Sequence, residues 1–591
     1  MGRSIPVPRR ESIGRWVRES SSSLVPLALL IGAGTGLGAI VFRWLITAFT
    51  RLFTGVADYS TAGHAASPHF PFLGMWFVLF LPVIAGAIYG PLVYRFAPEA
   101  RGHGVPEVMY AVAERGGRIP PQVSVVKALA SALCIGGGGS VGREGPIVQI
   151  GAALGSTVGR LTRLGGPRLK VLVACGAAGG IAATFNAPLA GPFFAMELIL
   201  KDFAAESFGA VVLASVMASV VGRAVLGDHT FLSLPHFSLR NPVEYLLFIA
   251  LGVLVGVVGV VFTKVLYRIE DACDWAWRGP EWLRPAVGGL LIGGLLLVLP
   301  QMYGVGYPVL ENAVQGKYVI GFLLILMVGK MLATSLAIGV GGSGGVFAPT
   351  LFIGAMAGTA FGDVAHLLAP TLTAPAGVYG LIGMGAALAG ATGAPITAVI
   401  ILFELTGEYT IILPLMTAVA MAAGTARLLA KETIYTGKLL RRGIDLDAPQ
   451  QPAPFTDTAV RQAAQPVPDP LRETTHLPEA ARALALSAHG MLPVVTDNGT
   501  YCGCVSARAV AETLTQPSSH DTTVADLATL PPTVTDDSTL ADALQALSAS
   551  AGTGLPVLDP RRAQLTGWIT HESVLAALQA HSETEHNGNQ P

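Results

Sequence analysis

The chain contains 591 residues, of which 52% are hydrophobic and 13% are charged, and its formal net charge is −1. Because soluble proteins carry roughly 25% charged residues, this composition predicts an integral membrane protein. The near-neutral charge excludes nucleic acid as a partner, since it offers no electrostatic attraction for phosphates.

The five cysteines do not show the spacing of a metal site. Cys502 and Cys504 are separated by one glycine and have no histidine cluster or second cysteine pair with them. A strand of small residues is therefore favoured over a redox or metal pair. We expect no metal site in this chain.

The first 20 residues carry five arginines and lead directly into an apolar run. No small-residue cleavage site follows a short apolar core, so a cleaved signal is not predicted. By the positive-inside rule the N-terminus lies in the cytoplasm, and Lys438, Arg441 and Arg442 place the C-terminus on the same side. We expect a multi-pass protein of the cell membrane with an even number of crossings.

Uncharged runs long enough to cross a bilayer of ~30 Å recur along the chain. They cover residues 20–42, 72–94, 246–263 and 285–310, with a longer run between Asp363 and Glu404. Glycines spaced as small residues inside the first run, at positions 32, 34, 36 and 38, favour close packing of helices in lipid. We therefore expect several spans in a compact bundle.

Between residues 98 and 200, and again between 330 and 407, short apolar segments are interrupted by glycine, proline and paired charges. This pattern is typical of discontinuous helices at membrane depth. In GGGGSVGREGPIVQIG, residues 136–151, Pro146 follows Arg143 and Glu144 just inside a new helix. A helix start attracts anions through its free N–H groups, so Glu144 is predicted either to mimic an anion or to gate its site.

The second interrupted region repeats the first. At an offset of 203 residues the pairs are Lys127/Lys330, Gly139/Gly342, Pro146/Pro349 and Gly151/Gly354, and at an offset of 207 they are Pro188/Pro395 and Glu197/Glu404. Two related halves with interrupted helices in matching places predict a membrane transport site at the repeat interface. If each half crosses an odd number of times, the halves are inverted and both termini lie in the cytoplasm.

A Pro- and Gln-rich linker at residues 445–470 ends the membrane domain. The segment that follows carries its own repeat, in which Leu492-Pro-Val-Val recurs as Leu555-Pro-Val-Leu after 63 residues. Its pattern of helix, strand, strand and helix predicts two copies that pack as a pair. A polar tail closes the chain at residues 583–591.

Four motifs give the sequence its resemblance to a known family: GHGVPE at 102–107, GREGP at 142–146, GGVFAP at 344–349, and Tyr435 in ETIYTG. Over about residues 26–442 the chain resembles the CLC family of chloride channels and proton-coupled chloride exchangers. Residues 465–578 resemble the paired CBS domains that many members carry.

The resemblance implies an all-α polytopic membrane protein of two inverted-topology repeats with discontinuous helices, plus a C-terminal α/β CBS pair. It places the transmembrane domain at residues 21–444, with repeats at 21–226 and 243–430, and the CBS pair at 471–582. It further implies a homodimer in the lipid bilayer, with a pore for chloride or a similar anion in each subunit and no enzymatic activity.

The resemblance assigns the gate to Glu144, whose carboxylate competes with the permeant anion for one position. A carboxylate that faces helix N-termini is held there as an anion, and it leaves or takes a proton when a halide replaces it. Arg143 and Gly145 flank the gate. The alternative is a structural ion pair between Glu144 and Arg143, but an ionisable group at membrane depth favours a function.

Three further positions match anion contacts of the family. Val346 and Phe347 match residues whose backbone N–H groups bind the central anion, and Tyr435 matches the tyrosine whose hydroxyl contacts it from the cytoplasmic side. The alternatives are a helix start that only packs and a tyrosine that lies at the membrane interface.

His103 departs from the family pattern, because the best-known chloride-selective members have a serine there. A neutral histidine can donate one N–H to an anion, and a protonated one adds a charge, so affinity would rise as the pH falls towards ~6.5. Alternatively His103 points away and is simply hydrogen-bonded, and the amides of Gly104 and Val105 bind the anion.

Leu198 is the second departure, because exchangers have a second glutamate directly after the one that Glu197 matches. Leucine cannot carry a proton. Glu197 aligns with Glu404 in the repeat, which favours a helix-end role over a proton relay. A passive chloride channel is therefore favoured, and a proton-coupled antiporter that replaces the inner glutamate with water or another group is the alternative.

Lys127 and Lys330 precede the two glycine-rich segments. A buried lysine near the pathway would raise the local anion concentration, whereas one that snorkels to an interface would have no specific role. Glu107 is expected to cap its helix start.

The CBS pair raises adenine nucleotide as a cofactor. In the expected pattern a serine or threonine, followed three residues later by an aspartate, holds the phosphate and ribose. Ser506 and Thr570 match the first position, but Ala509 and Ser573 stand where the aspartates are expected. A dimerising module coupled to gating is favoured.

A CBS-regulated membrane enzyme is the alternative from a different class. An intramembrane metalloprotease would need a motif such as HExxH on an apolar helix, and the sequence has none. A cation transporter would need more carboxylates in its spans than Glu144, Glu197 and Glu404 supply.

Overall fold

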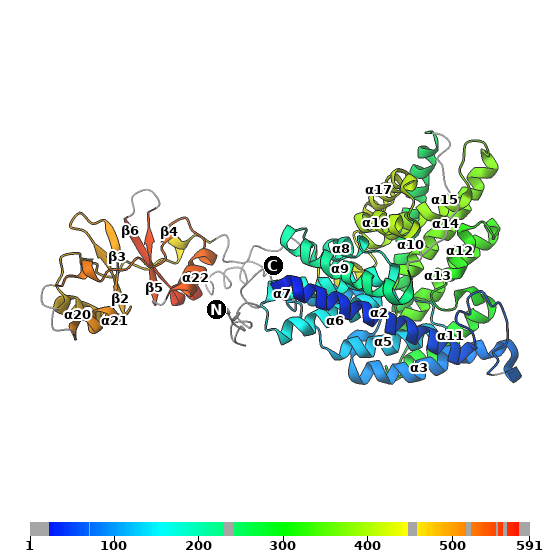
Figure 1. The fold of residues 1–591 in the computed structure, drawn as a ribbon, viewed down its shortest axis with the longest axis horizontal. Helices are drawn as coiled ribbons and strands as arrows, with labels where there is room; N and C mark the ends of the chain where they lie inside the picture. The colour runs from blue at the N-terminus through cyan, green and yellow to red at the C-terminus, as the bar shows by residue number, and fades with distance from the viewer. Residues whose placement is uncertain are drawn as a thin grey trace, which may run out of the picture. The chain divides into compact units, whose positions relative to one another are not determined.

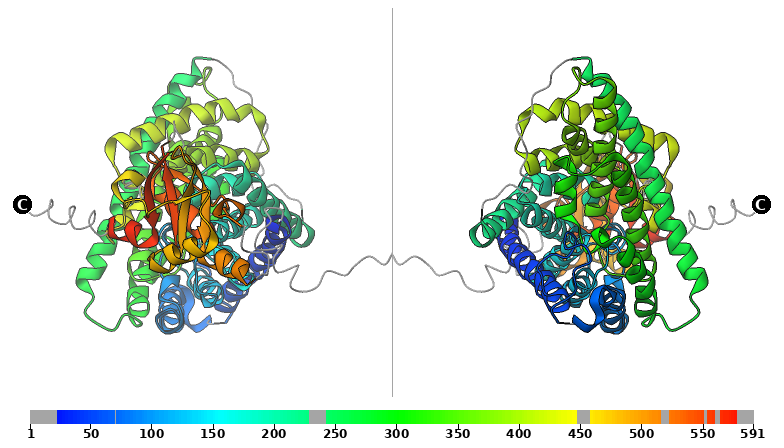
Figure 2. Two further views of the ribbon diagram at one scale, coloured as in Figure 1. Left: turned by 90° about the vertical axis from the view of Figure 1, so that its left-hand side faces the viewer. Right: turned by 90° about the vertical axis from the view of Figure 1, so that its right-hand side faces the viewer.

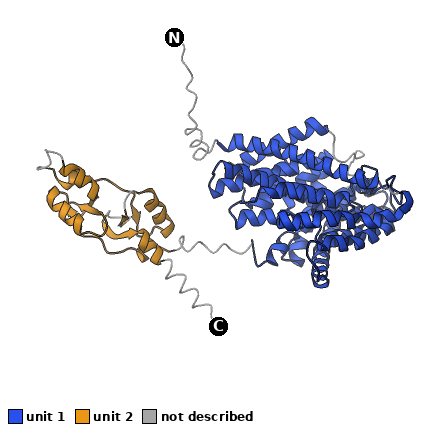
Figure 3. Cartoon of the chain, turned by 90° about the horizontal axis from the view of Figure 1, so that it is seen from below, with its two compact units in different colours: residues 1–446 blue, residues 447–591 orange. Residues whose placement is uncertain are grey.

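The computed structural model describes residues 23–69, 71–227, 242–446, 458–515, 522–550, 553–559 and 564–577. The chain divides into two compact units, residues 1–446 and 447–591 (Figure 3). The lead-in predicted at residues 1–20 and the tail predicted at 583–591 lie outside the described residues.

The first unit consists of helices, and eight of those described are long and apolar enough to cross a membrane. The first half of the unit (Figure 1) contains, long and short helices together, α2 (Leu24–Thr54), α3 (Phe77–Phe96), α4 (Val105–Ala113), α5 (Gln122–Gly136), α6 (Glu144–Leu161), α7 (Gly166–Phe185), α8 (Ala190–Phe194), the π-helical turn η4 (Ala195–Leu200) and α9 (Ala205–Leu226).

The second half follows the same order. Its helices are α10 (Glu244–Ala276), α11 (Arg284–Val298), α12 (Tyr307–Val314), α13 (Ile320–Gly339), α14 (Phe347–Leu368), α15 (Ala376–Thr392), α16 (Pro395–Thr406), α17 (Ile412–Leu429) and α18 (Thr436–Leu440).

The two halves share their backbone turns as well as their helix order. Gly138 and Gly341, in the turns after α5 and α13, have φ angles of +99° and +94°. These values lie in the left-handed region, which glycine enters without steric cost. Together with the helical content, this confirms the predicted fold class.

Glycines allow the long helices to approach closely. α2 packs against α9 and α10 packs against α17, and both pairs can be followed in Figures 1 and 2. A Cβ atom added at Gly36 would lie 2.9 Å from Ala218 O, and one at Gly256 would lie 2.8 Å from Ala422 O. The small-residue spacing in the first span therefore serves helix packing, as predicted. Gly34, by contrast, faces open space.

The second unit contains two copies of one α/β motif. The first has β1 (Leu471–Arg472), α20 (Leu477–Leu486), β2 (Met491–Val495), β3 (Tyr501–Ser506) and α21 (Ala507–Leu514), and the second has β4 (Val534–Thr535), α22 (Leu540–Ala549), β5 (Gly554–Leu558) and β6 (Leu565–Thr570). Each sheet pairs its first two strands in parallel and its last two antiparallel. The copies touch where the His489 and Trp568 rings lie 6.1 Å apart.

Cys502 and Cys504 lie in β3, as predicted, and both thiols are free. Burial raises the pKa of the Cys504 thiol to about 11. Since the thiolate is the form that binds metals and reacts with disulfides, this environment disfavours both roles.

Candidate functional site

Short backbone bridges bring the three glycine-rich motifs together. Gly142 and Gly345 exchange two hydrogen bonds of 2.7 Å, and Gly102 N–H donates to Gly342 O at 3.0 Å. Only residues without a side chain allow this approach: a Cβ at Gly345 would lie 2.7 Å from Gly145 N. The starts of α4, α6 and α14 therefore meet at one point.

Glu144 lies at this point and is 1% exposed. It is the first residue of α6, but its carboxylate faces the start of α14, where Oε2 accepts the Ala348 N–H at 3.3 Å. Oε1 accepts a hydrogen bond from the Tyr307 hydroxyl at the start of α12. A carboxylate of one repeat thus occupies the anion-attracting helix start of the other.

Arg143 is a more distant partner of this carboxylate. Its Nε lies 4.0 Å from Glu144 Oε1, and its guanidinium stacks 5.1 Å from the centre of the Tyr307 ring. A terminal nitrogen also donates to Thr184 O at 3.4 Å. The geometry therefore favours the helix start and Tyr307 as the groups that hold Glu144.

The start of α14 both packs and presents amides. Val346 is the N-cap residue, and the Phe347 ring lies 5.6 Å from Phe185 and 6.4 Å from Phe194. The adjacent Ala348 N–H points to the Glu144 carboxylate. Packing and a helix start that faces a carboxylate are thus combined at one place.

Tyr435, just before α18, is 1% exposed, which does not fit a membrane-interface position. Its segment is anchored on two sides: Ile434 N–H donates to Ala391 O in α15, and the Tyr267 hydroxyl of α10 donates to Ile434 O, each at 2.8 Å.

The first motif places Gly104 and Val105 at the start of α4. A Cβ at Gly104 would lie 2.7 Å from Gly145 O, so this position also requires glycine. Val105 is buried as the first helical residue. Glu107 lies in the first turn of α4, but its carboxylate pairs with Arg442 at 2.6 Å and no side-chain cap is formed.

His103 is 2% exposed, and neither of its ring nitrogens has a hydrogen-bond partner among the residues that the structure describes. The predicted alternative of a simply hydrogen-bonded histidine is therefore not observed. Lys127, Lys438 and Arg442 are the nearby charges, and the Tyr267 ring lies 6.5 Å away. Positive side chains around this imidazole favour an anion there by electrostatic attraction.

The two repeat lysines are fully buried, so neither snorkels to an interface. Lys127 Nζ donates to Ala100 O and Gly102 O, each at 2.8 Å. Lys330 Nζ donates to Ser140 Oγ at 2.9 Å, and to the carbonyls of residues 304 and 305 at 3.1 and 3.0 Å. Each lysine thus ties down the glycine loop that precedes a short helix.

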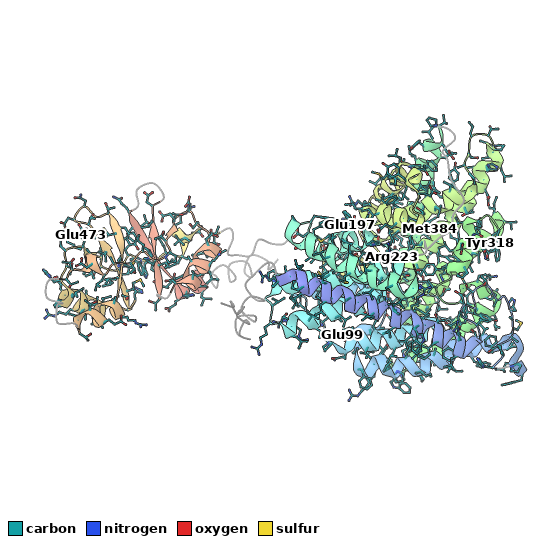
Figure 4. The ribbon with its side chains drawn as sticks, viewed as in Figure 1. Glu99, Glu197, Arg223, Tyr318, Met384 and Glu473 are labelled. Carbon is teal, nitrogen blue, oxygen red and sulfur yellow. The ribbon has the colours of Figure 1, made fainter. Side chains whose placement is uncertain are left out.

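Glu197 and Glu404 join the two repeats reciprocally. The Glu197 carboxylate, in η4, accepts the N–H groups of Ile396 and Thr397 at 3.1 and 2.8 Å. Glu404, in α16, accepts those of Leu189 and Ala190 at 2.8 and 2.6 Å. The geometry supports the helix-end role expected from the repeat. Figure 4 labels Glu197, and the neighbouring Leu198 is 6% exposed.

A cavity of about 470 Å³ lies against this site. Its lining includes Arg43, Arg143 and Arg223, with Asp58 as its acidic residue, and also Tyr303 and Tyr307. Figure 4 labels Arg223, whose Nε donates to Asn186 Oδ1 at 2.6 Å. The excess of positive charge favours anions in this cavity.

Sequence patterns did not point to Tyr307, Arg43 or Arg223. A signal for Tyr307 exists, because GVP at 104–106 recurs as GYP at 306–308. The two arginines lie at the ends of apolar runs, where charges are ordinary, so only the folded arrangement shows that they share a cavity.

In the second unit, Ser506 and Thr570 both serve helices. Ser506 Oγ accepts the Ala509 N–H at 3.2 Å, and Thr570 Oγ1 accepts the Ser573 N–H at 3.1 Å. Each hydroxyl therefore caps the helix that follows its strand.

Known proteins match the chain in the same two parts. The family described as voltage gated chloride channel matches residues 85–427, and the CBS domain matches residues 460–515 and 524–580. A protein of Ralstonia nicotianae with a ClcB-like chloride channel name is 32% identical over 426 residues, which cover 71% of this chain and 98% of that protein.

Two further matches carry exchanger names. The H(+)/Cl(-) exchange transporter ClcA of Vibrio parahaemolyticus is 38% identical over 371 residues, which cover 61% of this chain and 78% of that protein. The crystal structure of a slow cyanobacterial Cl−/H+ antiporter superposes with a TM-score of 0.63 at 26% identity, covering 71% of this chain and 97% of that one.

Proposed function

This chain belongs to the voltage gated chloride channel family, whose model matches residues 85–427. On this basis we propose that it exchanges chloride for protons across a membrane. The observation that carries the proposal is the Glu144 carboxylate at the start of α14. The exchanger names of the relatives support it. This reverses the preference for a passive channel that Leu198 suggested.

Glu144 performs both halves of the exchange in this proposal. As an anion it occupies the helix start, and chloride arriving at the amides of Val346 and Phe347 competes with it electrostatically. Once displaced, the carboxylate takes up a proton, because an isolated charge is costly in a water-poor site. Its return as an anion expels chloride and releases the proton.

The inner anion contacts come from the opposite side of the site. The Tyr435 hydroxyl, the His103 imidazole and the amides of Gly104 and Val105 bind the anion on its way to the cytoplasm. Lys127 adds positive potential from a buried position.

The inner proton step does not use a fixed carboxylate at position 198. Leu198 cannot take a proton, and both oxygens of Glu197 are engaged at the start of α16. Water is the remaining carrier between Glu144 and the cytoplasm. The channel stays the second candidate because of Leu198.

We propose the remaining organisation of the chain by analogy with the family. The transmembrane domain extends over residues 21–444 with both termini in the cytoplasm, and two copies form a homodimer with one pathway in each. The linker at 445–470 connects it to the CBS pair at 471–582, which acts as a dimerising module coupled to transport. Adenine nucleotide would need another contact than Ser506 and Thr570, whose hydroxyls cap helices.

Flux measurements in liposomes test the exchange. Liposomes that contain the purified protein are prepared with a higher chloride concentration inside than outside. Chloride efflux is then expected to drive protons into the vesicles against their concentration gradient. Glu144→Ala is expected to abolish proton movement while chloride efflux continues, because the competitor and the proton acceptor are lost together. Chloride efflux without proton movement in the wild type would support the channel instead.

A further inference from the structure

The loop at residues 304–308 is the repeat counterpart of the first motif at 102–106. Gly104 and Gly306 have φ angles of +86° and +87°, and each precedes a short helix with proline as its second residue. The side chain between glycine and proline differs: Val105 in the first repeat and Tyr307 in the second. The same backbone turn therefore carries an apolar side chain in the first repeat and a hydroxyl-bearing side chain in the second.

Tyr307 directs that hydroxyl at the gate. It donates a hydrogen bond to Glu144 Oε1. The Arg143 guanidinium also stacks on the Tyr307 ring, 5.1 Å from its centre. A hydroxyl next to a cation is a better donor to a carboxylate than an isolated one.

The loop that carries Tyr307 is held in place. Lys330 Nζ donates to the carbonyls of Gly304 and Val305 at 3.1 and 3.0 Å, directly before the helix start. The Tyr307 side chain is partly buried and lines the arginine-rich cavity. The hydroxyl is thus positioned before any movement of Glu144 begins.

We propose that Tyr307 is a latch for the gate: its hydroxyl stabilises the ionised Glu144 carboxylate at the start of α14 and so sets how readily chloride displaces it. A hydrogen bond to a charged acceptor is among the strongest in proteins. Its loss therefore shifts the competition in favour of chloride by about tenfold.

The latch rests on the proposed competition between Glu144 and chloride, and it does not depend on proton coupling. Tyr303 supplies a matched control, because it lines the same cavity and its hydroxyl donates to Gly136 O at 2.5 Å. Tyr303→Phe and Tyr307→Phe each remove one hydroxyl and one hydrogen bond, but only the second removes a bond to Glu144.

Isothermal titration of the purified full chain with chloride tests the latch. Tyr307→Phe is expected to bind chloride about tenfold more tightly than the wild type, and Tyr303→Phe is expected to bind it with unchanged affinity. In a Glu144→Gln background, which has no charged competitor, adding Tyr307→Phe is expected to change nothing.

Two results overturn the latch in different ways. If Glu144→Gln tightens chloride binding and Tyr307→Phe does not, the competition holds and the latch is wrong. If Glu144→Gln leaves the affinity unchanged, the competition itself fails and the latch with it. If the Glu144→Gln/Tyr307→Phe protein binds chloride, the Tyr307 hydroxyl is not needed for folding. If Tyr307→Phe alone does not fold, Tyr307→His can replace it. Its ring N–H can donate to Glu144, so its chloride affinity should be close to that of the wild type.

Discussion

The starts of α6 and α14 occupy matching places in the two repeats, yet they do opposite things. The first carries Glu144, whose carboxylate faces the other repeat, and the second carries Phe347 and the Ala348 amide that receives that carboxylate. Their preceding turns are nearly identical, with φ angles of +99° at Gly138 and +94° at Gly341. The two repeats thus share one backbone arrangement, and their different side chains give the two helix starts different roles.

Residues that both repeats keep have a different character. Lys127 and Lys330 each bind backbone carbonyls of a glycine loop, and Glu197 and Glu404 each bind the first N–H groups of a helix in the opposite repeat. These four shared side chains hold backbone groups in place, whereas Glu144 and Tyr307, at positions where the halves differ, meet each other at the proposed anion site. Three sets of variants can break this distinction.

The largest effect is expected for the buried lysines. Lys330→Met removes three hydrogen bonds and leaves buried acceptors without a donor, and Lys127→Met does the same to two carbonyls. Each should lower the free energy of unfolding by ~3 kcal/mol or more. Thermal unfolding in detergent measures this, with exposed Lys264→Met as the control. A lysine variant that stays stable but transports anions slowly would assign that lysine to the pathway instead.

A smaller effect is expected for the reciprocal glutamates. Glu197→Gln and Glu404→Gln each keep an acceptor oxygen but lose the charge at a helix start, so each should cost ~1 kcal/mol of stability. The number of chloride ions moved per proton should not change in either variant, and Glu114→Gln, at an exposed position, serves as control. A changed ratio for Glu197→Gln alone would make this residue a proton carrier and would break its equivalence with Glu404.

The helical repeats, the CBS pair and the meeting of the motifs could be predicted from the sequence. Glycine, proline and lysine recur at a fixed offset, and backbone turns require particular residues such as glycine and proline. Roles that depend on side-chain direction could not be predicted. Nothing local shows that Glu107 pairs with Arg442, 335 residues away, or that Tyr307 reaches Glu144. The preference for a passive channel had a similar weakness: it took one missing carboxylate, at Leu198, as decisive for the whole proton path, whereas similar proteins carry exchanger names.

The smallest effect is expected at the cavity, where the two halves differ in the charge that they contribute to the lining. Arg43, Arg143 and Arg223 all come from the first half, whereas Tyr303 and Tyr307 come from the second. Arg43 is exposed, so Arg43→Gln should act only through the potential that draws chloride in, and should slow transport about twofold at low ionic strength. At ~1 M salt, where the screening length is about 3 Å, the difference should vanish. Arg51→Gln, on the same helix and exposed but outside the cavity lining, should have no effect at either salt concentration. A loss in Arg43→Gln that persists at high salt would mean that this arginine contacts the anion directly, and the cavity would then contain a binding site that belongs to one repeat alone.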